Sequence, residues 1–152
     1  MKNWLKMVPL LLVILVGCSD NEEAGAKQVV HKDPDLKVSD TFTSGSYKMI
    51  GDEGRLGFIY DEATILKAGK PNKYMWHFWG AEEELDGRFK VIGTNQDTKE
   101  EVVVFEMDEL AGAHNGADAH TPSSMQLPSR GTWELDAYVG GDLFGTVVVE
   151  VE

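Results

Sequence analysis

The amino-acid sequence predicts an all-β fold, an antiparallel β-sandwich of about seven or eight strands. Short runs of alternating apolar and polar residues fill the chain from residue 41 onward, with turn signals about every 8 to 12 residues. In this part, apolar residues do not recur about every 3.6 positions over a long stretch, as they would in an amphipathic helix. Trp76 stands within an aromatic run, where the core tryptophan of a sandwich is expected. A sandwich is favoured over a barrel because the last two strands each offer one apolar face.

The first 40 residues have the composition of a targeting segment followed by a tether. Lys2 and Lys6 form a basic start, residues 7–16 are an apolar run interrupted only by Pro9, and Gly17 precedes Cys18. This pattern predicts a secretory signal, because a membrane-spanning helix needs about 20 apolar residues. The following polar residues up to 40 contain no sustained apolar period, which predicts a flexible tether.

The run Leu-Val-Gly-Cys at residues 15–18 resembles the lipobox of bacterial lipoproteins. In that motif the chain is cut before the cysteine, which carries diacylglycerol and further acyl chains such as palmitate. The resemblance implies a signal peptide over residues 1–17, a lipidated Cys18 beginning the tether of residues 18–40, and a folded domain over residues 41–152. It also implies attachment to the outer face of the cell membrane, since acyl chains contribute about 0.8 kcal/mol per buried methylene.

The C-terminal segment predicts a β-hairpin. Trp133, Leu135, Ala137 and Val139 alternate with polar residues, and valines alternate again over residues 147–151. The glycines at 140 and 141 suit a tight turn between these strands, because glycine readily adopts positive φ. A hairpin of this kind needs further strands to cover its apolar face.

Further strands are expected throughout the preceding part of the domain. The expected strands are, in chain order, residues 41–50, 55–60, 73–79, 87–94, 101–107, 123–127, 132–139 and 146–151, with residues 63–66 as a possible addition. Acidic residues 80–86 are expected to turn the chain, and residues 108–121 are expected to form a long loop.

The aromatic strand over residues 73–79 has two apolar faces. One face carries Tyr74, Trp76 and Phe78, and the other carries Met75, His77 and Trp79. Core packing explains most such strands. The alternative is that Met75 and Trp79 belong to a docking face for a partner.

The loop over residues 113–120 contains the best candidate for metal chemistry. His114, Asp118 and His120 supply two imidazoles and one carboxylate, and His77 becomes a further ligand if its strand ends beside the loop. Zinc and copper accept these ligand types, although the spacing fits no established motif. The alternative is structural: Asp118 caps a turn, Gly116 adopts positive φ, and His120 bonds to the backbone.

Composition and motifs disfavour several function classes. The formal charge of −12 opposes binding to nucleic acid, and the single cysteine excludes an internal disulfide framework. No nucleophile elbow or phosphate-binding glycine loop is present in the sequence, so we expect no enzyme activity.

Residues 73–80, 116–124, 131–138 and 143–145 resemble an uncharacterised family of small immunoglobulin-like lipoproteins of Gram-positive, Bacillus-type bacteria. The likeness runs from about Phe42 to the C-terminus. It implies an immunoglobulin-like sandwich on the outer face of the cell membrane and brings no catalytic residues. The strand pattern is also loosely similar to that of Bacillus-type proteinase inhibitors of sandwich form.

Together, these observations predict a membrane-anchored extracellular lipoprotein that binds a protein or polymer of the cell envelope without catalysing a reaction. One alternative is an envelope protein that holds zinc or copper through the His and Asp residues of the loop. The other alternative is an inhibitor of an extracellular proteinase.

Overall fold

The protein is described by a computed structural model, which covers residues 36–152. The predicted signal peptide, Cys18 and most of the predicted tether lie outside the described residues. The first strand begins at Thr41, and before it Ser39 donates its backbone N–H to Val148 O at 2.9 Å. No helix within residues 36–152 is long and apolar enough to cross a membrane.

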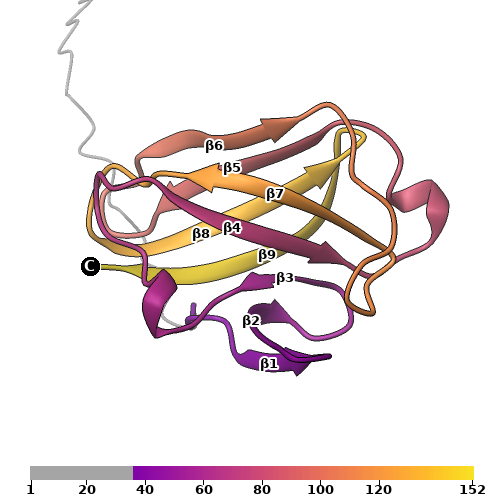
Figure 1. Cartoon of the computed structure of the whole chain (residues 1–152). Coiled ribbons are helices and arrows are strands. Elements are labelled where there is room, and N and C mark those ends of the chain that lie inside the picture. Colours follow the sequence, from indigo (N-terminus) through magenta and orange to yellow (C-terminus); the bar gives the residue numbers. More distant parts are fainter. Residues whose placement is uncertain (1–35) are drawn as a thin grey trace, which may run out of the picture.

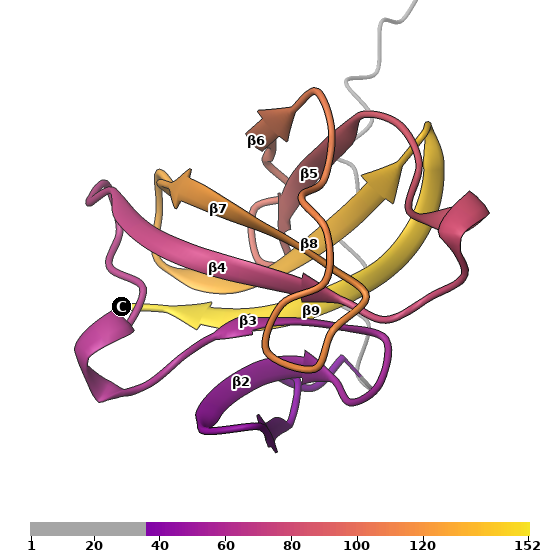
Figure 2. The same cartoon turned by 45° about the vertical axis from the view of Figure 1, so that its right-hand side comes forward.

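The nine strands of the described residues form two antiparallel sheets packed face to face (Figures 1 and 2), which confirms the predicted sandwich. One sheet has the order β1 (Thr41–Ser44), β2 (Tyr47–Asp52), β3 (Leu56–Ile59), β4 (Asn72–Phe78) and β7 (Ala119–Met125). The other has the order β6 (Glu101–Met107), β5 (Phe89–Asn95), β8 (Gly131–Val139) and β9 (Asp142–Val151). Two short 3₁₀ turns, η1 (Glu62–Thr64) and η2 (Glu82–Glu84), lie in the connections.

The core lies between the sheets and is rich in aromatic rings. Trp76 of β4 packs on Phe58 of β3 at 4.7 Å between ring centroids and on Phe89 of β5 at 5.7 Å. Phe89 also meets Phe78 at 5.0 Å, edge to face, the arrangement that the ring quadrupoles favour. These contacts join the two sheets through residues that alternate along their strands.

The C-terminal hairpin has the predicted form. Trp133, Leu135, Ala137 and Val139 are buried, and β8 pairs with β9 across the turn at the two glycines. Gly140 and Gly141 have φ values of +62° and +97°, which side chains other than glycine rarely adopt. Val147, Val149 and Val151 are buried on the returning strand, as the alternation predicted.

Three local predictions were wrong. Residues 41–50 form two strands, because Gly45 at φ +59° turns the chain into a β1–β2 hairpin. Residues 63–66 form no strand, because the Asp61 carboxylate accepts the backbone N–H groups of Ala63 and Thr64 and closes η1. The strand expected to start at 123 starts at Ala119, because the backbone of residues 119–122 pairs with β4 although apolar and polar residue types do not alternate there in the sequence. Pro122 is accepted there because β7 is an edge strand.

Candidate functional site

The aromatic strand β4 buries its inner face and, at His77, part of its outer face. Tyr74, Trp76 and Phe78 point into the core. They form one of the two faces that the alternation in the sequence predicted. His77 lies on the opposite, outer face, yet its side chain has no exposed surface. A second layer of chain must therefore cover the outer face of the five-stranded sheet at this point.

That cover is the connection between β6 and β7, which folds back over β3 and β4 (Figure 2). We call residues 111–118 the flap. The flap is a hairpin closed by paired backbone hydrogen bonds between His114 and Ala117, and its tip residues Asn115 and Gly116 have φ values of +51° and +81°. Its tip contacts the sheet through Trp79 Nε1, which donates to Gly116 O at 2.8 Å, and Ser44 Oγ, which donates to Asn115 O at 3.2 Å.

The fold brings three histidines together beneath and beside the flap. His77 and His120 are direct cross-strand partners on β4 and β7. The ring centroid of His114 lies 6.1 Å from that of His77 and 4.6 Å from that of His120. The strand that carries His77 thus lies beside the loop histidines, which was the condition for His77 to act as a further ligand.

Hydrogen bonds fix the protonation of the buried His77 ring. Its Nδ1 faces Met75 O at 3.2 Å, so Nδ1 carries the proton, and Nε2 accepts from Asn115 Nδ2 at 3.2 Å. Burial lowers the pKa of His77 from its usual 6.5; the Met75 carbonyl acts in the opposite direction, and the nearby His114 and His120 lower the pKa further. The site therefore favours a neutral imidazole at position 77.

Asp118 does not join the histidines. Its Oδ2 accepts the backbone N–H of Gly80 at 3.0 Å, just beyond the end of β4, and its backbone N–H donates to Phe78 O. His120 Nδ1 likewise donates to a backbone oxygen, Gly112 O, at 2.7 Å. In residues 36–152, no three His, Cys, Asp or Glu side chains are placed so that they could hold a metal ion. Metal binding by His77, His114, Asp118 and His120 stays a prediction from the sequence.

The proposed docking residues Met75 and Trp79 are half-buried on the outer face of the sheet. Trp79 meets Phe42 edge to face at 5.9 Å and stacks on His77 at 6.2 Å. Met75 lies opposite Pro122 of β7. The flap tip covers part of this face, and the role of these two residues in docking stays a prediction.

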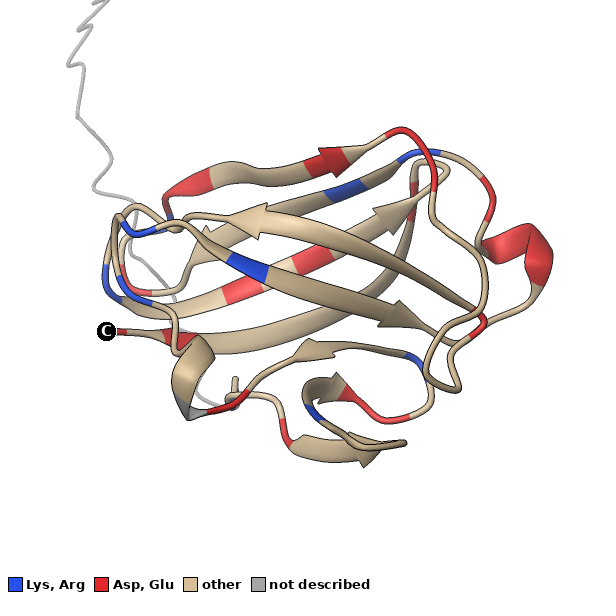
Figure 3. Ribbon diagram, viewed as in Figure 1, with Lys and Arg blue, Asp and Glu red and all other residues tan. Residues whose placement is uncertain are grey.

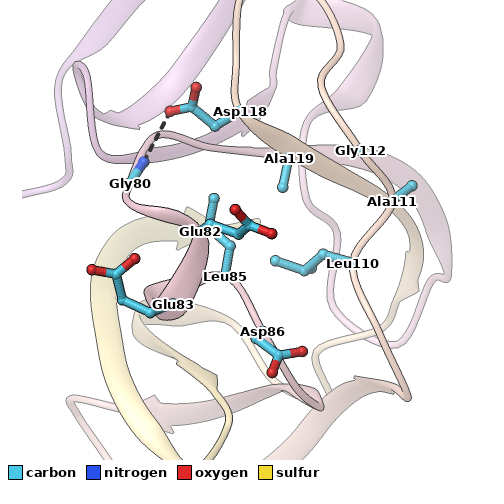
Figure 4. A pocket seen from close by; sticks show the side chains of 10 residues that line it. All are labelled: Gly80, Glu82, Glu83, Leu85, Asp86, Leu110, Ala111, Gly112, Asp118 and Ala119. Carbon is cyan, nitrogen blue, oxygen red and sulfur yellow. Dashed lines mark hydrogen bonds between the residues drawn. The ribbon is translucent and has the colours of Figure 1, made fainter.

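A pocket of about 810 Å³ lies at one end of the sandwich, and Figure 4 shows the residues that line it. Leu85, Leu110, Ala111 and Ala119 give it apolar surface, and Gly80 and Gly112 complete the lining with four acidic residues. The acidic residues are Glu82, Glu83, Asp86 and Asp118. The acidic run over residues 80–86 was the only signal of this pocket in the sequence, and a turn of this kind is usually a solvated surface.

Negative charge dominates this end of the molecule (Figure 3). Two arginines lie nearby, and both are engaged by acidic side chains. Arg55 bonds to Glu84 at 3.0 Å and lies 3.6 Å over the Phe144 ring, and Arg88 contacts Glu106 at 3.3 Å. The side-chain hydrogen bond from Arg55 and the backbone N–H of Ala81 lower the pKa of Glu84. No lysine or arginine lines the pocket itself, so its field attracts cations.

Comparison with solved structures finds the same sandwich in another protein. A crystal structure of a Bacillus anthracis protein, provisionally described as a lipoprotein, is 21% identical, with a TM-score of 0.62, over 81% of this chain and 91% of that chain. A superoxide reductase (neelaredoxin) from Ignicoccus hospitalis is 12% identical, with a TM-score of 0.40, over 64% of this chain and 80% of that chain. No match was found among curated proteins.

A family profile described as a domain of unknown function, DUF4871, matches residues 27–149. The matched range includes all of the strands except the last residues of β9, together with the flap and the acidic pocket. The chain therefore belongs to the DUF4871 family.

Proposed function

We propose that the protein is a lipid-anchored extracellular domain that binds a cationic group of a cell-envelope protein or polymer, and that it is not an enzyme. Two observations support the anchor. Residues 15–18 resemble a lipobox, and the Bacillus anthracis protein with the same fold is described as a lipoprotein.

The proposal includes an immunoglobulin-like topology, which the strand order supports. β3, β4 and β7 lie in one sheet as strands A, B and E do, and β6, β5, β8 and β9 follow the order C′, C, F and G in the other. The β1–β2 hairpin extends the first sheet beyond strand A. Domains of this architecture often bind through the loops at one end of the sandwich, and the acidic pocket is built from such loops.

The acidic pocket is the observation that carries the binding function. Four acidic residues and four apolar residues line a space of about 810 Å³, and no lysine or arginine is among its lining residues. A lysine or amine with an adjoining apolar stem would place its charge among the carboxylates and its methylenes on the apolar residues. A polyanion would be repelled from the same surface.

The position of the pocket suits a tethered domain. Figure 1 places η2, which borders the pocket, at the opposite end of the sandwich from the C-terminus. The chain enters the described domain through Ser39, which bonds to Val148 in the C-terminal half of β9. A flexible tether that enters there leaves the pocket end free to face away from the membrane.

Binding of a labelled lysine oligopeptide to the full chain in detergent micelles, measured by fluorescence anisotropy, tests this proposal. We expect binding that weakens as salt is raised, and no binding of a glutamine peptide of equal length. The triple variant Glu82→Gln/Glu83→Gln/Asp86→Asn should weaken binding by about tenfold or more, which corresponds to about 1.4 kcal/mol.

The matched control changes the same number of charges away from the pocket, with Glu100→Gln, Glu101→Gln and Glu150→Gln. These residues lie in or beside β6 and β9 and do not line the pocket. Equal loss of affinity in both triple variants would show that net charge, and not the pocket, attracts the peptide, and the binding site would be rejected.

A further inference from the structure

Residues 80–86, which we call the acidic turn, contribute to the pocket unevenly. Four consecutive or nearly consecutive residues of the turn line the pocket, namely Glu82, Glu83, Leu85 and Asp86. Figure 4 shows them across the pocket from Leu110. Glu84 lies between them in sequence but does not line the pocket, because its carboxylate is bound to Arg55. One carboxylate of the turn therefore has a structural partner.

Arg55 is itself fixed to the body of the sandwich. Its backbone O accepts the N–H of Trp79 at 2.9 Å. Its side-chain Nε donates to Phe144 O of β9 at 3.0 Å, and its guanidinium carbon lies 3.6 Å above the centre of the Phe144 ring. Phe144 is buried and packs edge to face against Phe78 at 5.6 Å. The planar guanidinium is thus oriented by a carbonyl and an aromatic face before it reaches the acidic turn.

The contact between Arg55 and Glu84 is closely packed. Nη2 of Arg55 lies 3.0 Å from Glu84 Oε1, and Glu84 Oε2 accepts the backbone N–H of Ala81 at 3.0 Å. A Cβ atom at Gly80 would lie 3.1 Å from Glu84 Oε2 and 3.2 Å from Arg55 Nη1, closer than side chains usually pack. The guanidinium, the carboxylate and the backbone of the turn therefore meet at one point, where only glycine fits.

Other contacts hold the two ends of the acidic turn. At its beginning, the backbone N–H of Gly80 donates to Asp118 Oδ2 at 3.0 Å. Just beyond its end, the backbone N–H of Gly140 donates to Arg88 O at 3.0 Å. Leu85 is partly buried and packs against the core. In η2, between these attachments, no residue is buried, so the middle of the turn is the part that the arginine contact holds.

We propose that Arg55 is a positioning residue for the acidic pocket. By joining Glu84 to β9, it holds η2 in the place where Glu82 and Glu83 line the pocket. Groups that are already in position bind more tightly, because less conformational entropy is lost when the ligand arrives. The effect on affinity rests on the proposed binding function, whereas the effect on the position of η2 does not.

Charge and positioning predict opposite effects for Arg55. It lines a neighbouring pocket of about 320 Å³ that shares Glu83 and Asp86 with the acidic pocket, so its charge repels a cationic ligand nearby. If repulsion were its only effect, Arg55→Gln would raise the affinity for a lysine peptide. If Arg55 positions η2, the same variant lowers that affinity.

Arg88 provides the matched control for the loss of one positive charge. Its side chain lies 3.3 Å from Glu106 and 3.9 Å from Asp108, and it lines neither of these two pockets. The bond from Gly140 to Arg88 uses the backbone carbonyl, so Arg88→Gln leaves it in place. This variant changes the charge at the same end of the molecule without changing the contact with Glu84.

Fluorescence anisotropy with the labelled lysine oligopeptide, on the full chain in detergent micelles, measures the affinity. We expect Arg55→Gln to weaken binding by about three- to fivefold, the range that an ion pair of this exposure supports. Arg55→Lys should lie between the unaltered chain and Arg55→Gln, because lysine keeps the charge but lacks the fork that reaches both Glu84 and Phe144 O. Arg88→Gln should bind at least as tightly as the unaltered chain.

A double-mutant cycle separates positioning from general support of the fold. In the triple variant Glu82→Gln/Glu83→Gln/Asp86→Asn, Arg55 has no pocket carboxylate of the turn left to position. Adding Arg55→Gln to this variant should therefore cause no further loss of affinity. A residue that only stabilised the fold would lower the affinity by the same factor in both backgrounds. Low salt keeps the weaker binding measurable.

Hydrogen exchange of the full chain in detergent, followed by mass spectrometry, tests the position of η2 without a ligand. The backbone N–H groups of Ala81, Glu84 and Leu85 donate to acceptors within the acidic turn. We expect peptides covering residues 80–86 to exchange faster by about threefold or more in Arg55→Gln than in Arg88→Gln. Peptides from β8 should exchange equally in both variants and serve as the internal reference.

Binding by Arg55→Gln that equals or exceeds that of the unaltered chain would overturn the proposal, since only the effect of charge would remain. Equal exchange of residues 80–86 in the two arginine variants would also overturn it. Faster exchange of β8 in Arg55→Gln would show that Arg55 supports the whole fold, and the positioning role would be rejected. If the unaltered chain does not bind the peptide but the acidic turn exchanges faster in Arg55→Gln, only the binding function fails.

Discussion

Trp76 Nε1 donates a hydrogen bond of 3.1 Å to Ser123 Oγ, between neighbouring strands and inside the core. Ser123 in turn donates to Tyr74 O at 3.3 Å, so the indole N–H, the hydroxyl and the carbonyl form one buried chain. The network lets β4 keep a tryptophan at the centre of the sandwich without leaving a buried donor unpaired.

Removal of the hydroxyl should therefore destabilise the domain. We expect Ser123→Ala to lower the free energy of unfolding by about 1–3 kcal/mol, because the indole N–H loses its acceptor in a buried position. Trp76→Ala should cost about 3–5 kcal/mol through lost packing. Urea unfolding measures both changes, and Ser124→Ala on the exposed face of β7 serves as the control. An unchanged midpoint for Ser123→Ala would mean that water replaces the hydroxyl.

Asn95 should be a second stabilising residue, at the other end of the sandwich from η2. Its Oδ1 accepts the backbone N–H groups of Asp97 and Thr98, and its Nδ2 donates to Ser129 Oγ and Arg130 O. The side chain has no exposed surface. Asn95→Ala should lower the free energy of unfolding by about 2–4 kcal/mol, since it leaves several buried groups unpaired.

Chemical denaturation of Asn95→Ala, compared with Gln126→Ala, checks this prediction. The Gln126 side chain is exposed and donates one hydrogen bond, to Gly69 O, so its removal should change the free energy of unfolding by less than about 0.5 kcal/mol. Similar losses in the two variants would refute a special role for Asn95.

The Glu84 carboxylate should titrate below its usual value of 4.5. The side-chain hydrogen bond from Arg55 and the backbone N–H of Ala81 stabilise its charged form and lower its pKa. The lowered pKa means that the stabilisation is present above 4.5 and is lost as pH falls through the lowered value. Carbon-detected NMR titration should show this shift, and Arg55→Gln should move the pKa back upward. An unaltered titration in Arg55→Gln would assign the shift to another cause.

Tyr74 should ionise only in strongly alkaline solution. Burial raises its pKa from 10.0 to about 12, and its hydroxyl donates to Thr64 O at 2.8 Å. Because the folded state favours the neutral phenol, the associated stability is present below pH 10 and is lost as pH rises toward 12. Ultraviolet titration of phenolate absorbance should show a late ionisation step that is absent in Tyr74→Phe. A Tyr74→Phe curve identical to that of the unaltered chain would contradict this assignment.

Local patterns in the sequence were sufficient to predict the sandwich and its C-terminal hairpin. The alternation from Trp133 to Val139 and the two glycines that follow define a strand and a turn without reference to the rest of the chain. The same patterns predicted Tyr74, Trp76 and Phe78 on one face of β4. These features depend on side chains two residues apart and on glycine conformations, both of which are local.

The tertiary structure alone decided which residues meet at the functional sites. Ala119 to Pro122 join the sheet because β4 offers its hydrogen-bonding edge, and this pairing sets His120 opposite His77. The Asp118 carboxylate accepts the backbone N–H of Gly80, although its closeness in sequence to the histidines suggested that they bind one metal ion together. The acidic pocket forms because the turn at residues 80–86 and the flap come from distant parts of the chain to one end of the sandwich. Such long-range contacts depend on how the two sheets pack, which no local pattern in the sequence records.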